Sequence, residues 1–197
     1  MTADDRASRA AAQWRTERPD LDPFPMEVLG RLAELTQLVA RDHVHPLFTA
    51  AGLHAGEFDV LATLRRSGPP YELTPTALYE ATMVSSGGMT SRLDRLEKAG
   101  LVARRPHPED RRASLVALTA AGHDLLDDLL PRHVENERRV LAGLEAAEQQ
   151  QLNALLAKLL RSLSAMSGAA ADQAAAGSLT ATRPPVTGSG RKRTRQR

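Results

Sequence analysis

At 197 residues the chain is long enough to fold as one domain around a full hydrophobic core. It contains no apolar run long enough to span a bilayer, and its first residues lack the apolar segment of a signal peptide. We therefore expect a soluble, cytoplasmic protein that makes no membrane contact. Because cysteine is absent, disulfides, thiolate metal sites and thiol-based redox sensing are excluded.

The net charge of +2 is unevenly distributed along the chain. Residues 166–197 hold six basic residues and one acidic residue, so the remainder of the chain is slightly acidic. Within that remainder, residues 74–118 carry seven basic and five acidic side chains, whereas both flanking parts are negative. Positive charge is thus concentrated in one central segment, as binding to phosphate groups requires.

The N-terminal third predicts three helices separated by proline-containing breaks. Residues 3–18 are rich in Ala and Arg and predict a first helix, which a cluster of prolines then interrupts. Leucines at near-helical spacing predict a long helix over residues 26–45, which Pro46 should end or kink. A further helix is expected over residues 54–66, ending at the breaker cluster of residues 67–70.

The central segment predicts two short helices in close succession. Thr before Pro at the start of residues 74–83 supplies an N-cap and a proline at the first helical position. The next helix is predicted over residues 85–99, capped by Ser85 or Ser86 and followed by Gly100 as its C′ residue.

The remaining sequence predicts a hairpin followed by long helices. Residues 101–105 and 114–118 are alternating or apolar runs around a polar loop, which is typical of a β-hairpin. Helices are expected over residues 119–144, with a possible bend at its proline, and over residues 145–163. Residues 166–197 are rich in Ala, Gly, Ser and Pro and then basic, which predicts a disordered tail.

Helix, turn, helix and a hairpin with a basic tip is the plan of a winged helix-turn-helix, which places a helix in the DNA major groove. We therefore predict a mainly α fold with a small β-hairpin wing, and double-stranded DNA as the partner. The winged module spans about residues 54–118, and helices over about 26–48 and 119–165 form a platform, preceded by an extra helix and linker in residues 1–25. The platform's apolar stripes predict a homodimer, the alternative being that they complete a monomer's core.

The helix over residues 85–99 has one apolar face and one polar face. Met89, Leu93 and Leu96 form the apolar stripe, so small and polar residues lie opposite and can approach the base edges. At the hairpin tip, Asp110 could hold Arg112 extended toward the minor groove. A solvated polar face and a surface charge cluster are the alternatives. The predicted DNA contacts are Ser85, Ser86, Gly87, Thr90, Ser91, Arg95, Asp110, Arg111 and Arg112.

Three stretches carry a resemblance to the MarR family of winged-helix repressors. They are SSGGMTSRLDRLEKAGLV at residues 85–102, DRR at residues 110–112 and LTAAG at residues 118–122. The resemblance covers about residues 26–165. It implies an obligate dimer that binds a palindromic operator and whose affinity for DNA is weakened by a small ligand.

Within that family the chain is most similar to the PecS and urate-responsive branch, whose relatives also include sensors of tricarboxylates such as citrate or trans-aconitate. That resemblance implies a ligand switch at Trp14, Asp59, Arg92 and Arg104. The two arginines would hold an anionic ligand, which competes with Asp59 and shifts the recognition helix. The helical wheel turns Arg92 toward the protein body, where an arginine needs an acid or an anion. A structural ion pair of Asp59 with Arg92 or Arg104 is the alternative.

Other functions find less support in the residues. No HExxH spacing, Gly-rich phosphate loop or nucleophile elbow is present, so we predict neither catalysis nor a cofactor. A regulator that responds instead to phenolic compounds or to a metal is the alternative, with His43, His45 and His107 as candidate zinc ligands. A sequence-nonspecific DNA protein driven by the basic tail at residues 191–197 is the remaining possibility.

Overall fold

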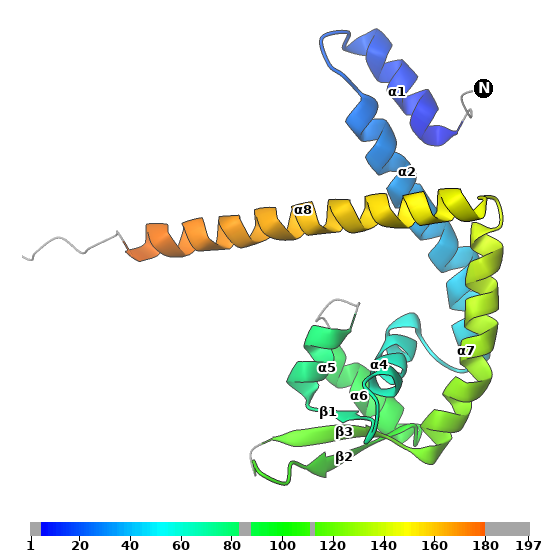
Figure 1. Ribbon diagram of the computed structural model, residues 1–197, viewed down its shortest axis with the longest axis vertical. Coiled ribbons are helices and arrows are strands. Elements are labelled where there is room, and N and C mark those ends of the chain that lie inside the picture. Colours follow the sequence, from blue (N-terminus) through cyan, green and yellow to red (C-terminus); the bar gives the residue numbers. More distant parts are fainter. Residues whose placement is uncertain (1–4, 83–87, 111–112, 180–197) are drawn as a thin grey trace, which may run out of the picture. The chain divides into compact units, whose positions relative to one another are not determined.

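The computed structural model describes residues 5–82, 88–110 and 113–179, with side chains described as far as residue 166. The chain forms two compact units, residues 1–143 and residues 144–197. The first unit contains the N-terminal helices, the winged module and the helix that follows it (Figure 1). Among the described residues of the second unit, the regular structure is a single long helix.

The first two helices pack against each other as a pair, α1 (Arg6–Glu17) against α2 (Phe24–Leu38). Asp5 caps α1 by accepting a hydrogen bond of 2.8 Å from the backbone N–H of Ser8. The same carboxylate pairs with Arg31 of α2 at 2.8 Å, and the predicted N-terminal helix is thereby tied to the platform.

The long predicted helix continues past Pro46 instead of ending there. A π-helical segment, η1 (Val39–Val44), follows α2 directly, and α3 (His45–Ala50) follows η1. Pro46 lies in the first turn of α3, where a residue needs no N–H of its own for the helix. The wider π-helical turn before it accommodates the ring, so the expected break becomes a local change of helix type.

The winged module consists of α4 (Ala55–Arg66), α5 (Pro75–Ala81), α6 (Met89–Lys98) and a small antiparallel sheet (Figure 1). The N-cap predicted at Thr74 is confirmed, because its hydroxyl accepts a 3.2 Å hydrogen bond from the N–H of Ala77. Gly100 has a φ of 72°, the left-handed conformation expected of a helix C′ residue.

The sheet has three strands in the order β1–β3–β2, with β2 (Val102–Pro106) and β3 (Ser114–Leu118) forming the predicted wing. The two-residue strand β1 (Glu72–Leu73) was not predicted. It pairs with β3 through residues 116–117, so the sheet connects the wing to the segment before α5.

The hydrophobic core lies between α4, α6, the sheet and α7 (Ala120–Leu141). Thr119 caps α7 as predicted, accepting a hydrogen bond of 3.1 Å from the N–H of Gly122. The fully buried side chains are Val60, Leu61, Thr63, Leu64, Leu78, Leu96, Val102, Val116, Leu126 and Leu129. Because α7 contributes the last two, it is fixed directly to the winged module.

The second unit is α8 (Ala146–Leu179). The helix continues beyond residue 166, where the sequence predicted a disordered tail to begin, because the Ala-rich stretch there also favours a helix. Residues 180–197, with the basic segment, lie outside the described part of the chain. No helix among the described residues is both long and apolar enough to cross a membrane.

Candidate DNA interface and effector site

Helix α6 presents the two faces that its sequence predicts. Met89, Leu93 and Leu96 are buried, whereas Thr90 and Ser91 are exposed. Within the described residues the helix begins at Met89, after a glycine whose φ is 86°. The predicted caps and contacts at Ser85, Ser86 and Gly87 lie outside the described residues, so the described part of the exposed face consists of Thr90, Ser91 and their neighbours.

Arg95 was predicted to contact DNA, and the structure gives it partners within the protein. Its Nε donates to Oε1 of Glu57 on α4 at 2.5 Å. Its Nη1 donates to the hydroxyl oxygen of Ser91, one turn earlier in α6, at 2.8 Å. The Arg95 side chain is still 49% exposed, so it links the exposed face of α6 to α4.

Glu57 is a buried carboxylate that the sequence interpretation overlooked. It is only 4% exposed, and its second oxygen accepts a hydrogen bond of 2.8 Å from the N–H of His54 at the start of α4. Burial raises the pKa of this carboxyl, but the His54 N–H and the Arg95 guanidinium outweigh burial, so the pKa is lowered overall. The signal was available, since an acid three residues after a helix start is the spacing of a capping box.

Arg92 points toward the protein body, as the helical wheel predicts, and is half-buried. Its guanidinium lies against Gly56, so closely that a Cβ at that position would be 2.6 Å from Nε and 3.0 Å from Cζ. Asp59, also half-buried, follows Gly56 by three residues and therefore lies on the same side of α4. The structure thus brings two of the four predicted ligand residues to one neighbourhood.

Arg104 lies on the other flank of α6. Its guanidinium pairs with Asp94 at 2.6 Å and with Glu97 at 3.4 Å. These two acids lie roughly 140–160° around the helix from Arg92 at about 100° per residue. The register of the wing turns Arg104 toward these acids, on a different side of α6 from Arg92.

Trp14 lies on α1, where it is 45% exposed. The helix α1 packs along α2, at the end of α2 away from the winged module (Figure 1). Trp14 therefore belongs to a helix whose main contacts are with α2.

The tip of the wing is a tight turn around Asp110. Its carbonyl accepts a hydrogen bond of 3.0 Å from the N–H of Ala113, and the Nδ1 atom of His107 accepts from the N–H of Asp110 at 3.3 Å. The predicted contacts Arg111 and Arg112, and therefore the pairing of Asp110 with Arg112, lie outside the described residues.

A polar and aromatic cluster joins α4 to α7, and the sequence interpretation missed it. Arg65 lies 3.0 Å from Nδ1 of His123 and pairs with Asp127 at 2.9 Å. Its guanidinium also lies over the ring of Tyr71, 5.2 Å from the ring centre. The cluster fixes the orientation of α7 relative to the winged module.

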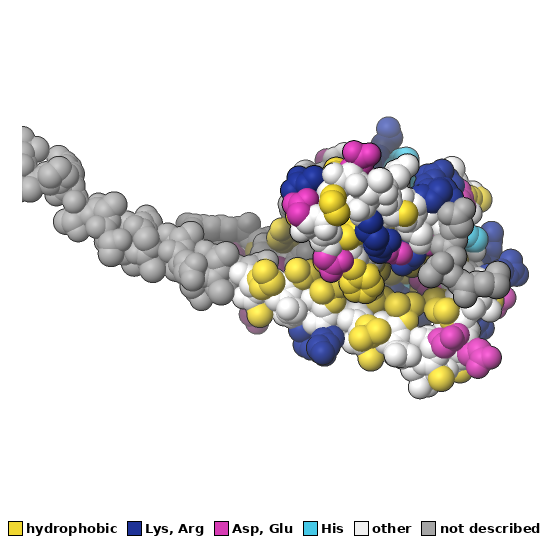
Figure 2. Space-filling view, turned by 90° about the horizontal axis from the view of Figure 1, so that it is seen from above, with side chains coloured by type: hydrophobic (Ala, Val, Ile, Leu, Met, Phe, Trp, Pro, Cys, Tyr) yellow, Lys and Arg dark blue, Asp and Glu magenta, His cyan; other side chains and the backbone are white. Residues whose placement is uncertain are grey.

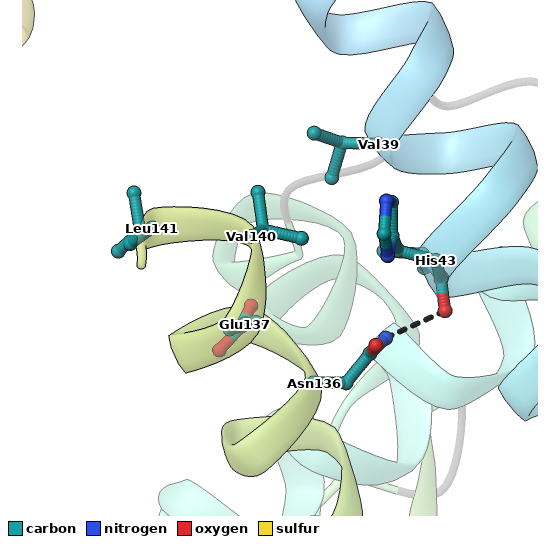
Figure 3. A pocket seen from close by; sticks show the side chains of 7 residues that line it. Val39, His43, Asn136, Glu137, Val140 and Leu141 are labelled. Atoms are coloured by element: carbon teal, nitrogen blue, oxygen red, sulfur yellow. Dashed lines mark hydrogen bonds between the residues drawn. The ribbon is translucent and has the colours of Figure 1, made fainter. Parts of the chain in front are cut away.

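A cavity of about 340 Å³ lies between η1 and α7 (Figure 3). Its walls are mostly apolar, and at its polar side the amide of Asn136 donates a hydrogen bond of 2.6 Å to the carbonyl of His43. Within the described part of the chain, no three His, Cys, Asp or Glu side chains are grouped as a metal site. The residues that line the cavity are Val39, His43, Val44, Asn136, Glu137, Val140 and Leu141.

Several known proteins are similar to this chain in sequence and fold. Residues 51–113 match the MarR family. Over 151 residues, 77% of this chain and 90% of the relative, the sequence is 44% identical to the HTH-type transcriptional regulator PecS of Dickeya dadantii. The fold is similar to that of Sco3205, a MarR family transcriptional regulator from Streptomyces coelicolor solved in complex with DNA, with a TM-score of 0.63 and 25% identity over 69% of this chain and 85% of that one. It is also similar to BpsR of Bordetella bronchiseptica, in a structure concerning regulation of its DNA binding by 6-hydroxynicotinic acid (TM-score 0.55, 27% identity, 64% of this chain and 91% of that one).

The three helices, the exposed face of α6 and the wing define a winged helix-turn-helix DNA-binding protein. The identity across most of both chains extends this assignment. The chain belongs to the MarR family of winged-helix transcriptional regulators. It is therefore a DNA-binding regulator of transcription and not an enzyme, as its sequence predicted.

Proposed function

We propose that the chain is a homodimeric repressor that binds a palindromic operator and is released from it by a small organic anion. The DNA contacts are Thr90 and Ser91 of α6, the predicted residues just before this helix, and those of the wing tip. The observation that carries the effector assignment is the position of Arg92, a half-buried cation of the recognition helix that lies against the first turn of α4.

Exposed apolar side chains support the dimer. On α2, Phe24 is 60% exposed and Leu29 is 59% exposed, and on α8 Leu160 is 65% exposed. Figure 2 shows such hydrophobic side chains (yellow) at the surface, and soluble monomers expose only small apolar patches. A second copy that covers such helices would remove this surface from water and place two recognition helices on one palindrome.

The proposed release is a competition for Arg92. An anion beside its guanidinium draws the side chain away from Asp59. Because Arg92 directly precedes the buried Leu93, this movement also changes how α6 packs on the core. A coupling of about 1–3 kcal/mol, or roughly 5- to 150-fold in affinity, is typical of such regulation. The effector class is a small organic anion such as urate, citrate or trans-aconitate. A small aromatic acid belongs to the same class, and the relation to BpsR favours it.

We propose Asp59 and Arg92 as the effector contacts within one chain. We assign Arg104 the role of holding the wing against α6 through Asp94, where it lies. Trp14 would join the site only from the second copy of the dimer.

The test is operator binding at fixed salt, on DNA from upstream of the protein's own gene, with urate, citrate, trans-aconitate and 6-hydroxynicotinate titrated in. One of these anions should release wild-type protein, and Arg92→Ala should remove that release while specific binding persists. Arg104→Ala is the matched arginine control and should still respond to the anion. Release that survives Arg92→Ala, or is lost only in Arg104→Ala, would contradict the assignment.

The apolar cavity between η1 and α7 favours a second candidate, a regulator that responds to a phenolic compound. Its volume of about 340 Å³ lies within the range of small-molecule sites, and its walls are mostly apolar. Val140→Phe would narrow the cavity (Figure 3), so loss of release by phenols in that variant, with anions inactive on the wild type, would favour this candidate.

A further inference from the structure

Two arginines of the recognition helix rest on a single turn of α4. Arg92 and Arg95 are three residues apart and therefore lie on the same side of α6. Arg92 contacts Gly56, and Arg95 pairs with the adjacent residue, Glu57. The first turn of α4 is thus the surface on which the recognition helix is seated.

Glu57 is held more firmly than either arginine. Its carboxylate is buried, and each of its oxygens has a partner, the backbone N–H of His54 at 2.8 Å and Nε of Arg95 at 2.5 Å. A buried carboxylate is stable only when it is paired, and a position in the first helical turn adds the favourable interaction with the helix dipole. Its position therefore fixes the position of the arginine that it holds.

Arg95 connects the buried Glu57 to the exposed face of α6. While Nε binds Glu57, Nη1 donates to the hydroxyl oxygen of Ser91 at 2.8 Å. A hydroxyl that accepts on one side directs its own hydrogen elsewhere. Because Ser91 is exposed, that hydrogen is available to an acceptor outside the protein, such as a phosphate oxygen, guanine N7 or O6, or thymine O4.

We propose that Glu57 is a positioning residue for DNA recognition, which acts through Arg95 to orient the Ser91 hydroxyl as a hydrogen-bond donor toward the operator. This inference rests on the proposed DNA contact of Ser91. It assigns Arg95 the role of a connecting side chain, in place of the direct base contact that its sequence position suggested. It also predicts that two residues that need not touch each other, Glu57 and Ser91, are energetically coupled in operator binding.

The experiment is a double-mutant cycle on the full-length protein, with operator and nonspecific DNA titrated at the same salt concentration. Glu57→Gln keeps the shape of the side chain and removes its charge. We expect it to weaken operator binding by several-fold, about as much as loss of the Ser91 hydroxyl itself, and to leave nonspecific binding within about twofold. Ser91→Ala should weaken operator binding by several-fold in the wild type and have almost no effect in the Glu57→Gln background.

The outcomes separate the two levels of the proposal. If Ser91→Ala weakens binding equally in both backgrounds, the positioning role of Glu57 is wrong while the DNA contact stands. If Ser91→Ala has no effect in the wild type, the DNA contact itself is wrong and the inference is overturned with it. If Glu57→Gln fails to fold, Arg95→Gln takes its place in the cycle, because it removes the side chain that connects Glu57 to Ser91. Glu34→Gln, which removes a carboxylate that pairs with Arg6 outside the winged module, is the matched control.

Discussion

Replacing Gly56 with alanine inserts one methyl group between α4 and the Arg92 side chain. The new Cβ would lie 2.6 Å from Nε, 3.0 Å from Cζ and 3.3 Å from Cδ, whereas ordinary contacts begin at 3.4 Å. The Nε atom must therefore move by about 0.8 Å, the difference between 3.4 Å and 2.6 Å. The obstructing atoms belong to the far end of a flexible side chain, so the backbone of α4 need not change.

The substitution should leave stability nearly unchanged but impair function. Alanine in a helix is favoured over glycine by roughly 0.5–1 kcal/mol, which offsets the rearrangement of Arg92, so we expect the free energy of unfolding to change by less than about 1 kcal/mol. Operator affinity should fall roughly fivefold without any effector, because the guanidinium is displaced from its position against Gly56. Addition of the effector should then have little further effect.

Chemical denaturation and operator titrations with and without effector measure both quantities on one protein. Gly30→Ala is the matched control, since a Cβ there would meet only the Cβ of Ala7, at an ordinary 3.5 Å. A Gly56→Ala protein that binds and releases DNA like the wild type would refute the assigned role of Arg92. A loss of several kcal/mol in stability would show that the Arg92 side chain cannot move away from the new Cβ.

Two further substitutions test contacts elsewhere in the fold, at the start of α7 and between α1 and α2. A Cβ at Gly122 would lie 2.3 Å from the backbone oxygen of Leu101, which cannot move aside. Gly122→Ala should therefore lower the free energy of unfolding, measured by urea denaturation, by about 1–3 kcal/mol. A variant as stable as the wild type would contradict this prediction. The hydrogen bond from Arg31 lowers the pKa of Asp5 from 3.8 to about 2. Because the folded-state pKa is the lower one, this contribution to stability is present above about pH 4 and is lost as the pH falls toward 2. The fluorescence of Trp14, the single tryptophan, should report loosening of α1 in that window, and Asp5→Asn should abolish this pH dependence.

Features fixed by neighbouring residues were predictable from the sequence. The caps at Thr74 and Thr119 depend on a side chain and an N–H three residues away, and both are present. The left-handed Gly100 and the buried stripe of α6 are equally local, since they depend only on helix periodicity and a helix end. The winged fold followed from the order of such local features.

Features that depend on pairing between distant segments were not predictable. The strand β1 exists because Glu72 and Leu73 pair with β3, more than 40 residues later in the sequence. The orientation of Arg104 follows from the hairpin register, which sets it opposite the buried Val116 and thus on the sheet face toward α6. The pairing of Arg95 was not predictable for the same reason. A helical wheel gives the side of α6 that Arg95 occupies, but not the buried Glu57 of α4 that lies on that side.

The geometry of the α4 turn links the effector proposal to the DNA-reading proposal. Gly56 and Glu57 are adjacent, one in contact with Arg92 and the other paired with Arg95. An anion that displaces Arg92 therefore acts within one residue of the support that orients the DNA-reading face. Release from DNA would then require only an exchange of side-chain partners at this turn, on the scale of one charged hydrogen bond, about 1.5–3 kcal/mol. That scale matches the coupling of about 1–3 kcal/mol that ligand-responsive regulation needs, without a rearrangement of the core beneath α6.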